Sequence, residues 1–116
     1  SLHEYKINDI YNNNDEKKRL EYIQKILTQL KKEKENNNDL KLYNVVDKFY
    51  NKGISGLDII KTIEKTRMFN ENDKIEYLFL FNDAKKEFRN EKTFMIFMLT
   101  IIFLRNNCSL ENITFM

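Results

Sequence analysis

Apolar residues recur at helical spacing along most of the chain, with short polar runs between them. The helices predicted from this pattern cover residues 15–35, 40–52, 56–67, 73–89 and 91–104. In the first of them, Leu20, Ile23 and Leu27 follow one another at three- and four-residue steps, which places them on one face. Asp15 is positioned to cap its start. The pattern predicts an all-α fold, a single bundle of about five helices.

The last two predicted helices carry more apolar surface than one face can hold. Helix 73–89 has two apolar lines, so we expect it to touch more than one neighbour. The run 94–104 is apolar all round, and its 11 residues are too few to span a bilayer, which takes about 20. It is predicted to be either central in its own bundle or buried by another chain. The candidate subunit-interface residues are Phe94, Phe97, Met98, Ile101, Phe103 and Leu104.

The clearest local signal is a helix stop followed at once by a helix start. Gly53 is placed to end a helix in the left-handed conformation that glycine adopts without a Cβ penalty. Ser55 and Asp58 form an S-x-x-D capping box for the next helix, which begins at Gly56. These four residues are predicted to be structural, as the corner and caps of an αα-hairpin.

The two ends of the chain carry weaker patterns. Residues 1–14 are predicted to form a tail or a short N-terminal helix, and residues 106–116 a short C-terminal turn or tail. The helical domain is expected to cover residues 15–105. Because the chain begins with Ser1 and not with methionine, we expect it to be a piece of a longer protein.

Composition supports the helical prediction, and the sequence lacks the motifs of common catalytic and binding sites. The chain has no proline and only two glycines, which argues against turn-rich β folds. It lacks phosphate-loop, dinucleotide-binding and metalloprotease motifs. The only histidine, His3, and the only cysteine, Cys108, have no local groups to tune them. We therefore predict no catalytic, cofactor-binding or metal-binding residue, no membrane contact, and a reducing, intracellular compartment.

Charge leaves one alternative open. The net charge is only +2, with 20 basic and 18 acidic residues interspersed, whereas dedicated nucleic-acid-binding domains usually show a basic face. The first helix is locally basic through Lys17, Lys18, Arg19, Lys25, Lys31, Lys32 and Lys34, but acidic residues alternate with them. A solvated face is the favoured interpretation, and a nucleic-acid-binding module or a stand-alone helical adaptor is the alternative.

Residues 38–63 resemble the C-terminal domain of clamp-loader subunits, most closely the small subunits of replication factor C. The shared features are a polar turn, a helix that ends in glycine at Gly53, and the helix start Ile54-Ser55-Gly56-Leu57-Asp58-Ile59-Ile60. Downstream, residues 74–89 look like the next helix of the family, with Arg89 near its end. The resemblance extends over roughly residues 20–105.

The resemblance implies a collar domain, a non-catalytic helical bundle that joins neighbouring subunits into a mainly pentameric ring. The implied parent protein is a P-loop ATPase of DNA replication, nuclear if eukaryotic, that loads a sliding clamp onto primer–template DNA. It would bind ATP and Mg²⁺, the clamp and the DNA through domains absent from this chain. The implied partners of the collar are the other clamp-loader subunits.

Overall fold

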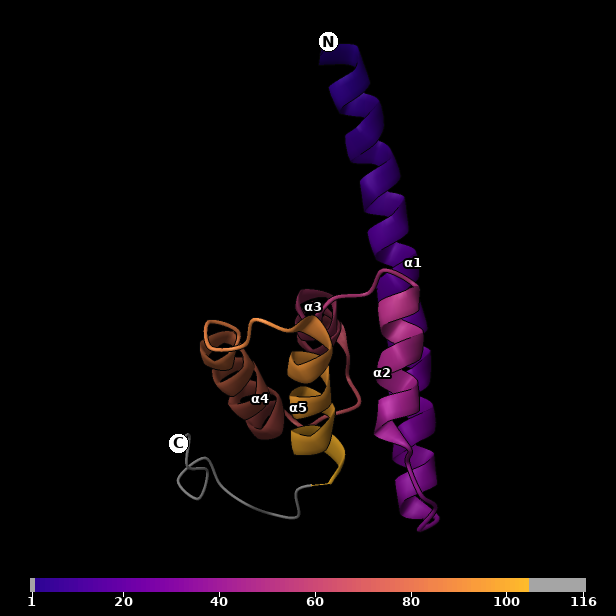
Figure 1. The fold of residues 1–116 in the computed structure, drawn as a ribbon, viewed down its shortest axis with the longest axis vertical. Coiled ribbons are helices and arrows are strands. Elements are labelled where there is room, and N and C mark those ends of the chain that lie inside the picture. Colours follow the sequence, from indigo (N-terminus) through magenta and orange to yellow (C-terminus); the bar gives the residue numbers. More distant parts are fainter. Residues whose placement is uncertain (1, 105–116) are drawn as a thin grey trace.

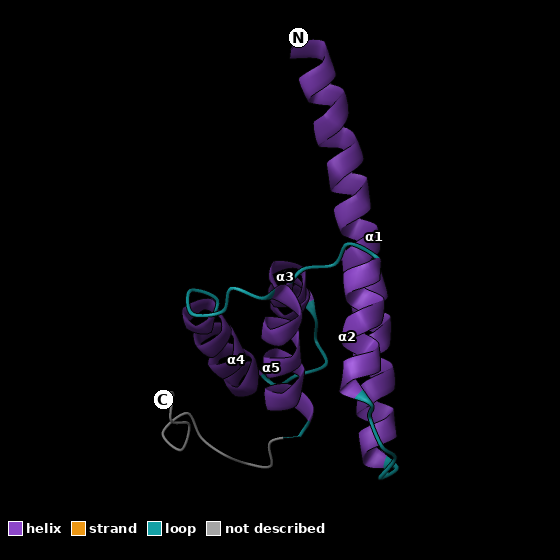
Figure 2. Ribbon diagram, viewed as in Figure 1, coloured by secondary structure: helices purple, strands orange, loops and turns teal. Residues whose placement is uncertain are grey.

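The computed structural model describes the backbone of residues 2–104 and the side chains of residues 15–104. Its helices are α1 (Leu2–Glu35), α2 (Leu42–Asn51), α3 (Gly56–Lys65), α4 (Glu71–Ala84) and α5 (Glu91–Phe103). The described backbone contains no strand, so the predicted all-α fold is confirmed. α1 and α2 run antiparallel at one side of the bundle, and α5 lies between them and α4 (Figure 1, Figure 2). The prediction for residues 106–116 lies outside the described residues.

The start of α1 is a correction to the sequence prediction. The helix begins at Leu2, so Asp15 lies inside it and does not cap it. The asparagines at positions 12–14 each disfavour a helix by no more than about 0.7 kcal/mol. None of them removes a backbone donor as a proline would, and the chain contains no proline. The helix therefore continues through these residues, and its N-terminal part extends beyond the other helices (Figure 1).

The turn between α2 and α3 has the geometry that the sequence predicted. Gly53 has a φ of +78°, in the left-handed region. Its N–H donates to the carbonyl oxygen of Tyr50 at 3.0 Å, and the N–H of Ile54 donates to the carbonyl oxygen of Phe49 at 2.9 Å. These are the two bonds of a Schellman motif. The chain then enters α3 at the predicted residue, Gly56.

Asparagine side chains cap the N-termini of the last two helices. The Oδ1 of Asn70 accepts a hydrogen bond from the N–H of Asp73 at 2.8 Å, and the Oδ1 of Asn90 accepts one from Thr93 at 2.9 Å. Each satisfies a donor that the first helical turn leaves without an intrahelical partner. Both helices therefore start where short polar side chains precede an apolar run.

α4 ends at Ala84, earlier than the predicted Arg89. The N–H of Glu87 donates to the carbonyl oxygen of Ala84 at 2.9 Å, three residues back, which tightens the final turn. The tighter turn carries Phe88 onto α5, where its ring centroid lies 5.5 Å from that of Phe94. The other boundaries after α1 agree with the predictions to within two residues.

α5 lies at the centre of the bundle. It contacts α1, α2 and α3, and the Phe97 ring packs edge-on against Phe81 of α4 at 6.1 Å between centroids. Of the two predicted environments for this helix, the structure shows the first, a central position in its own bundle. Its buried residues are Phe94, Met95, Met98, Leu99, Ile102 and Phe103.

Candidate functional site

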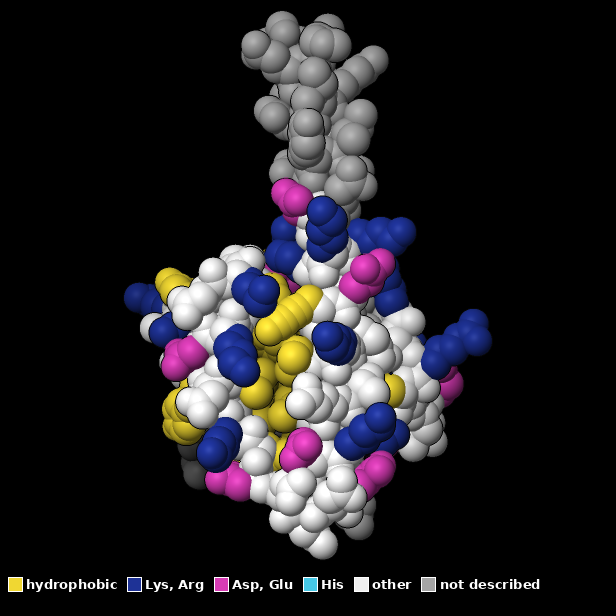
Figure 3. All heavy atoms as spheres, turned by 90° about the vertical axis from the view of Figure 1, so that its right-hand side faces the viewer, with side chains coloured by type: hydrophobic (Ala, Val, Ile, Leu, Met, Phe, Trp, Pro, Cys, Tyr) yellow, Lys and Arg dark blue, Asp and Glu magenta, His cyan; other side chains and the backbone are white. Residues whose placement is uncertain are grey.

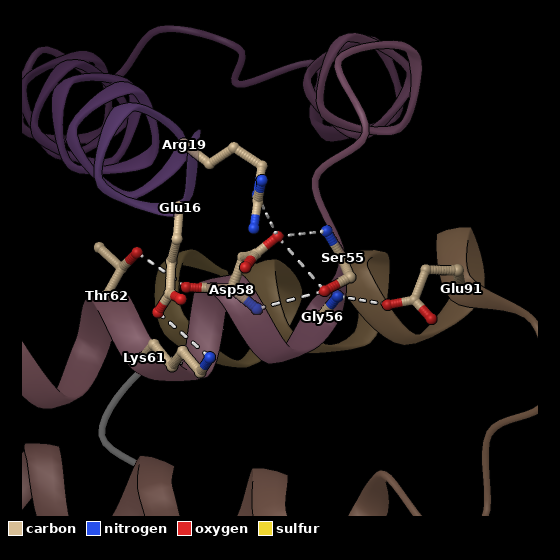
Figure 4. A network of polar contacts seen from close by, with 8 residues as sticks. All are labelled: Glu16, Arg19, Ser55, Gly56, Asp58, Lys61, Thr62 and Glu91. Atoms are coloured by element: carbon tan, nitrogen blue, oxygen red, sulfur yellow. Dashed lines mark hydrogen bonds and ion pairs between the residues drawn. The ribbon is translucent and has the colours of Figure 1, made fainter. Parts of the chain in front are cut away.

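A buried carboxylate ties α1 to the beginning of α3 (Figure 4). Asp58 is only 6% exposed, and its Oδ2 accepts a hydrogen bond from the N–H of Ser55 at 3.0 Å. The N–H of Asp58 donates in return to the Ser55 hydroxyl at 3.4 Å, which completes the predicted capping box. The same Oδ2 lies 3.1 Å from the Nε of Arg19 on α1. Asp58 therefore caps one helix and holds a second.

Three further contacts surround this carboxylate. Thr62 donates from its hydroxyl to the carbonyl oxygen of Asp58 at 2.8 Å. Lys61 of α3 pairs with Glu16 of α1 at 3.1 Å between Nζ and Oε1. Glu91, in the first turn of α5, accepts a hydrogen bond from the N–H of Gly56 (Figure 4). The cluster joins α1, α3 and α5 through bonds among its own members.

Gly56 allows α3 and α5 to approach each other closely. A Cβ at this position would lie 2.6 Å from Cε2 of Phe94 and 3.1 Å from Cε of Met98, and contacts of this kind force neighbouring groups to move. Gly53 is used differently, because nothing lies within 4 Å of a Cβ built there and only its φ requires glycine. The corner residues are therefore structural, as predicted.

The described side chains were compared with two kinds of site, a metal centre and a membrane-spanning helix. Among the side chains of residues 15–104, no group of three or more histidine, cysteine, aspartate or glutamate residues is arranged to hold a metal ion. No helix among the described residues has the length and apolar character needed to cross a membrane. The predictions for His3 and Cys108 concern side chains outside the described residues.

The predicted interface on α5 is largely internal, which is a correction. Phe94, Met98 and Phe103 are at most 5% exposed, because the helices around α5 cover them. Phe97 and Ile101 are half-buried, and Leu104, at 54%, is the one member of the predicted set that is exposed. The three buried residues provide no surface to another chain.

The largest exposed apolar side chains of the last two helices lie instead on α4. Ile75 is 62% and Phe79 71% exposed, and the half-buried Leu78 lies between them in the sequence. We call these three residues the α4 ridge. With Asn82, Asp83 and Lys86 they border a surface depression of about 490 Å³. The second apolar line predicted on this helix is thus present, and the described helices do not cover it fully.

A second apolar surface runs between α1 and α2. Its floor is formed by Leu30 and Phe49, both buried, and its walls include the half-buried Tyr22, Ile26 and Val45. We call these five residues the α1–α2 groove, and it encloses about 290 Å³. Figure 3 shows an apolar channel on this side of the molecule with charged side chains beside it, and Glu33, Asp39, Lys41 and Lys48 line the groove.

A cavity of about 640 Å³ lies between α1 and α3. Two buried threonines stand in its wall, and each already has a partner. Thr62 donates to the Asp58 carbonyl oxygen, and the hydroxyl of Thr66 accepts from the N–H of Met68 at 3.3 Å. Two lysines, Lys17 and Lys65, and two glutamates, Glu16 and Glu21, also line the cavity. The mixed charges and paired threonines do not define a ligand site.

The basic face predicted on the first helix is partly used inside the molecule. Arg19 is committed to Asp58, and Lys31 donates to the carbonyl oxygen of Met68 at 3.2 Å. Glutamates lie beside the lysines along this face (Figure 3). The face does not form the continuous basic stripe that is typical of a nucleic-acid-binding surface.

Comparison with known protein families, with curated proteins and with solved structures finds no match to this chain.

Proposed function

We propose that this chain is the collar domain of a clamp-loader subunit, a non-catalytic module that joins neighbouring subunits. The observation that carries the proposal is the segment 38–63, which resembles that family. The residues behind the resemblance have defined local roles, since Gly53 forms the Schellman turn and Ser55 and Asp58 form the capping box. In this proposal, ATP, Mg²⁺, the sliding clamp and primer–template DNA are bound by other domains of the parent protein.

The α4 ridge supports a role in assembly. Exposed apolar residues clustered on one helix mark sites where another protein can bind. Burying a phenylalanine or isoleucine side chain contributes about 1.5–3 kcal/mol, so Ile75 and Phe79 can supply much of the energy of a contact. The proposed subunit interface therefore includes the α4 ridge and Leu104, in place of the buried part of α5.

The test is co-purification with the other clamp-loader subunits of the source organism. The chain, expressed with an affinity tag, is expected to retain those subunits. Phe79→Glu is expected to lower their recovery at least tenfold, because a charge then occupies the apolar contact. Tyr43→Glu is the matched control, since Tyr43 is an aromatic residue of 72% exposure that is not part of the α4 ridge or the α1–α2 groove. Failure of the unchanged chain to retain any subunit would refute the proposal.

The alternative of a nucleic-acid-binding module is tested separately by a gel-shift series across salt concentration. Binding through lysines would weaken steeply as salt rises, because each phosphate contact releases a counterion. Lys17→Glu with Lys18→Glu would then abolish binding. We expect no binding by the unchanged chain, since Arg19 and Lys31 are engaged within the bundle. Tight, salt-sensitive binding would favour the alternative over the collar.

A further inference from the structure

Met68 lies in the connection between α3 and α4, where its polar atoms are hydrogen-bonded. Its N–H donates to the hydroxyl of Thr66 at 3.3 Å. Two side chains of α1 bind its other polar atoms. Lys31 donates to its carbonyl oxygen at 3.2 Å, and the Nε2 of Gln24 donates to its sulfur at 3.7 Å. The sulfur is therefore part of the attachment of this connection to α1.

The three methionines with described side chains differ in their access to solvent. Met95 and Met98 of α5 are fully buried, with 0% of each residue exposed. Met68 is half-buried and lines a surface depression of about 500 Å³, which is bordered by the end of α1, the first half of α4 and the end of α5. Because oxidation of a sulfur depends on its exposure, a dissolved oxidant reaches Met68 before it reaches the two methionines of α5.

The hydrogen bond from Gln24 suits this position to an oxidised side chain. A thioether sulfur is a weak acceptor with two lone pairs, and the bond from Gln24 uses one of them. A sulfoxide is polar, and its oxygen is the stronger acceptor. The three rotatable bonds of methionine allow this oxygen to turn towards the amide. At a position enclosed by apolar side chains, the same oxygen would lack a donor and would disturb the packing.

We infer that Met68 is a modification site, oxidised by hydrogen peroxide to a sulfoxide that Gln24 then holds. The second lone pair of the sulfur attacks one peroxide oxygen, so that a sulfur–oxygen bond forms and the oxygen–oxygen bond breaks. The hydrogen of the transferred oxygen moves to the departing hydroxide, which leaves as water. Sulfur loses two electrons and the peroxide gains them. Gln24 is a positioning residue, because it binds the product and takes no part in the electron transfer.

Peptide mapping after peroxide treatment of the whole chain tests the site. Trypsin cuts after lysine and arginine, so Met68 is recovered in peptide 68–74, and Met95 and Met98 together in peptide 93–105. In the folded chain, Met68 is expected to be oxidised faster than the other two by about tenfold or more, because the core protects them. In urea the three rates are expected to converge. A Met68 rate equal to the other two in the folded chain would overturn the inference.

Thermal unfolding of oxidised and reduced samples tests the role of Gln24, which solvent exposure alone would not reveal. In Gln24→Leu, oxidation is expected to lower the unfolding midpoint by about 4 °C more than in the unchanged chain, because the sulfoxide loses its donor. Gln24 also donates to the hydroxyl of Thr28 at 3.2 Å, so Thr28→Ala is the matched control and is expected to behave as the unchanged chain does. Equal shifts in Gln24→Leu and the unchanged chain would overturn the role of Gln24.

Met68→Leu separates oxidation at this residue from oxidation elsewhere. Peroxide also attacks thiols and other thioethers, so Cys108 and Met116 can react in every sample. Leucine has a similar volume and cannot be oxidised. In a Gln24→Leu background, Met68→Leu is therefore expected to abolish the additional shift, and a shift that persisted would assign it to another residue. The inference goes beyond the proposed function, and none of its readouts involves another subunit, so either can fail without the other.

Discussion

The cluster around Asp58 buries a charged side chain, whereas the outer face of α4 exposes apolar ones. In the cluster, the Asp58 carboxylate is 6% exposed and hydrogen-bonded to Ser55 and Arg19. On α4, an apolar ring, that of Phe79, is 71% exposed. A buried carboxylate needs hydrogen-bonding partners, whereas single exposed apolar side chains are common and only a cluster of them indicates a contact surface. The carboxylate has its partners within the molecule, whereas the described residues leave most of the Phe79 ring uncovered.

The largest expected difference between the core and the outer face of α4 is in the stability of two phenylalanine variants, one from each region. Phe94→Ala is expected to lower the free energy of unfolding by about 3–5 kcal/mol, because it opens a cavity in the core. Phe79→Ala is expected to change it by no more than about 0.5 kcal/mol, as is usual for an exposed side chain. Urea unfolding followed by circular dichroism measures both. Comparable losses in the two variants would mean that the α4 ridge belongs to the core.

The two glycines of the chain are required for different reasons, Gly56 for close packing and Gly53 for its backbone conformation. Gly56→Ala is expected to cost about 1–3 kcal/mol, since its Cβ would clash with Phe94. Gly53→Ala is expected to cost about 1 kcal/mol, because its φ of +78° strains any residue with a Cβ. The smaller Phe94→Leu side chain should recover part of the Gly56→Ala loss and none of the Gly53→Ala loss. Equal recovery in both would show that Gly56 is not limited by space.

The smallest expected effect concerns the ion pairs. Asp58→Asn is expected to cost about 1–2 kcal/mol, because it weakens the cap of α3 and the contact with Arg19. A double-mutant cycle with Arg19→Met should show a coupling of about 1 kcal/mol. Asp47→Asn is the control, since Asp47 pairs with Lys92 at 3.1 Å with its side chain 58% exposed, and such pairs contribute at most about 1 kcal/mol. Equal losses at Asp58 and Asp47 would contradict the role assigned to the buried carboxylate.

The features that could be predicted from sequence are those set by neighbouring residues. The turn at Gly53 and the capping box of Ser55 and Asp58 depend on residues within a few positions of one another, so their chemistry was visible in one short stretch. The all-α fold could also be predicted from the sequence, because helical periodicity extends over most of the chain. The start of α1 was missed since polar asparagines resemble a helix end although they permit a helix.

The features that could not be predicted depend on which helices meet. The apolar run of α5 is consistent with either a core or an interface, and only the arrangement of the other helices places Met98 inside. Arg19 and Asp58 are 39 residues apart, so no local pattern marks them as partners. The second apolar line of α4 was visible in the sequence, but its exposure was not, because exposure depends on the absence of a covering helix.

The central position of α5 also determines when the bundle can form during synthesis. α5 is the last helix of the described chain, and α1, α2, α3 and α4 all pack against it. Until residue 103 has been added, the four earlier helices lack the element that their apolar faces share. Domains generally fold as units as they are synthesised from the N-terminus, so this one is expected to fold late, in a single cooperative step.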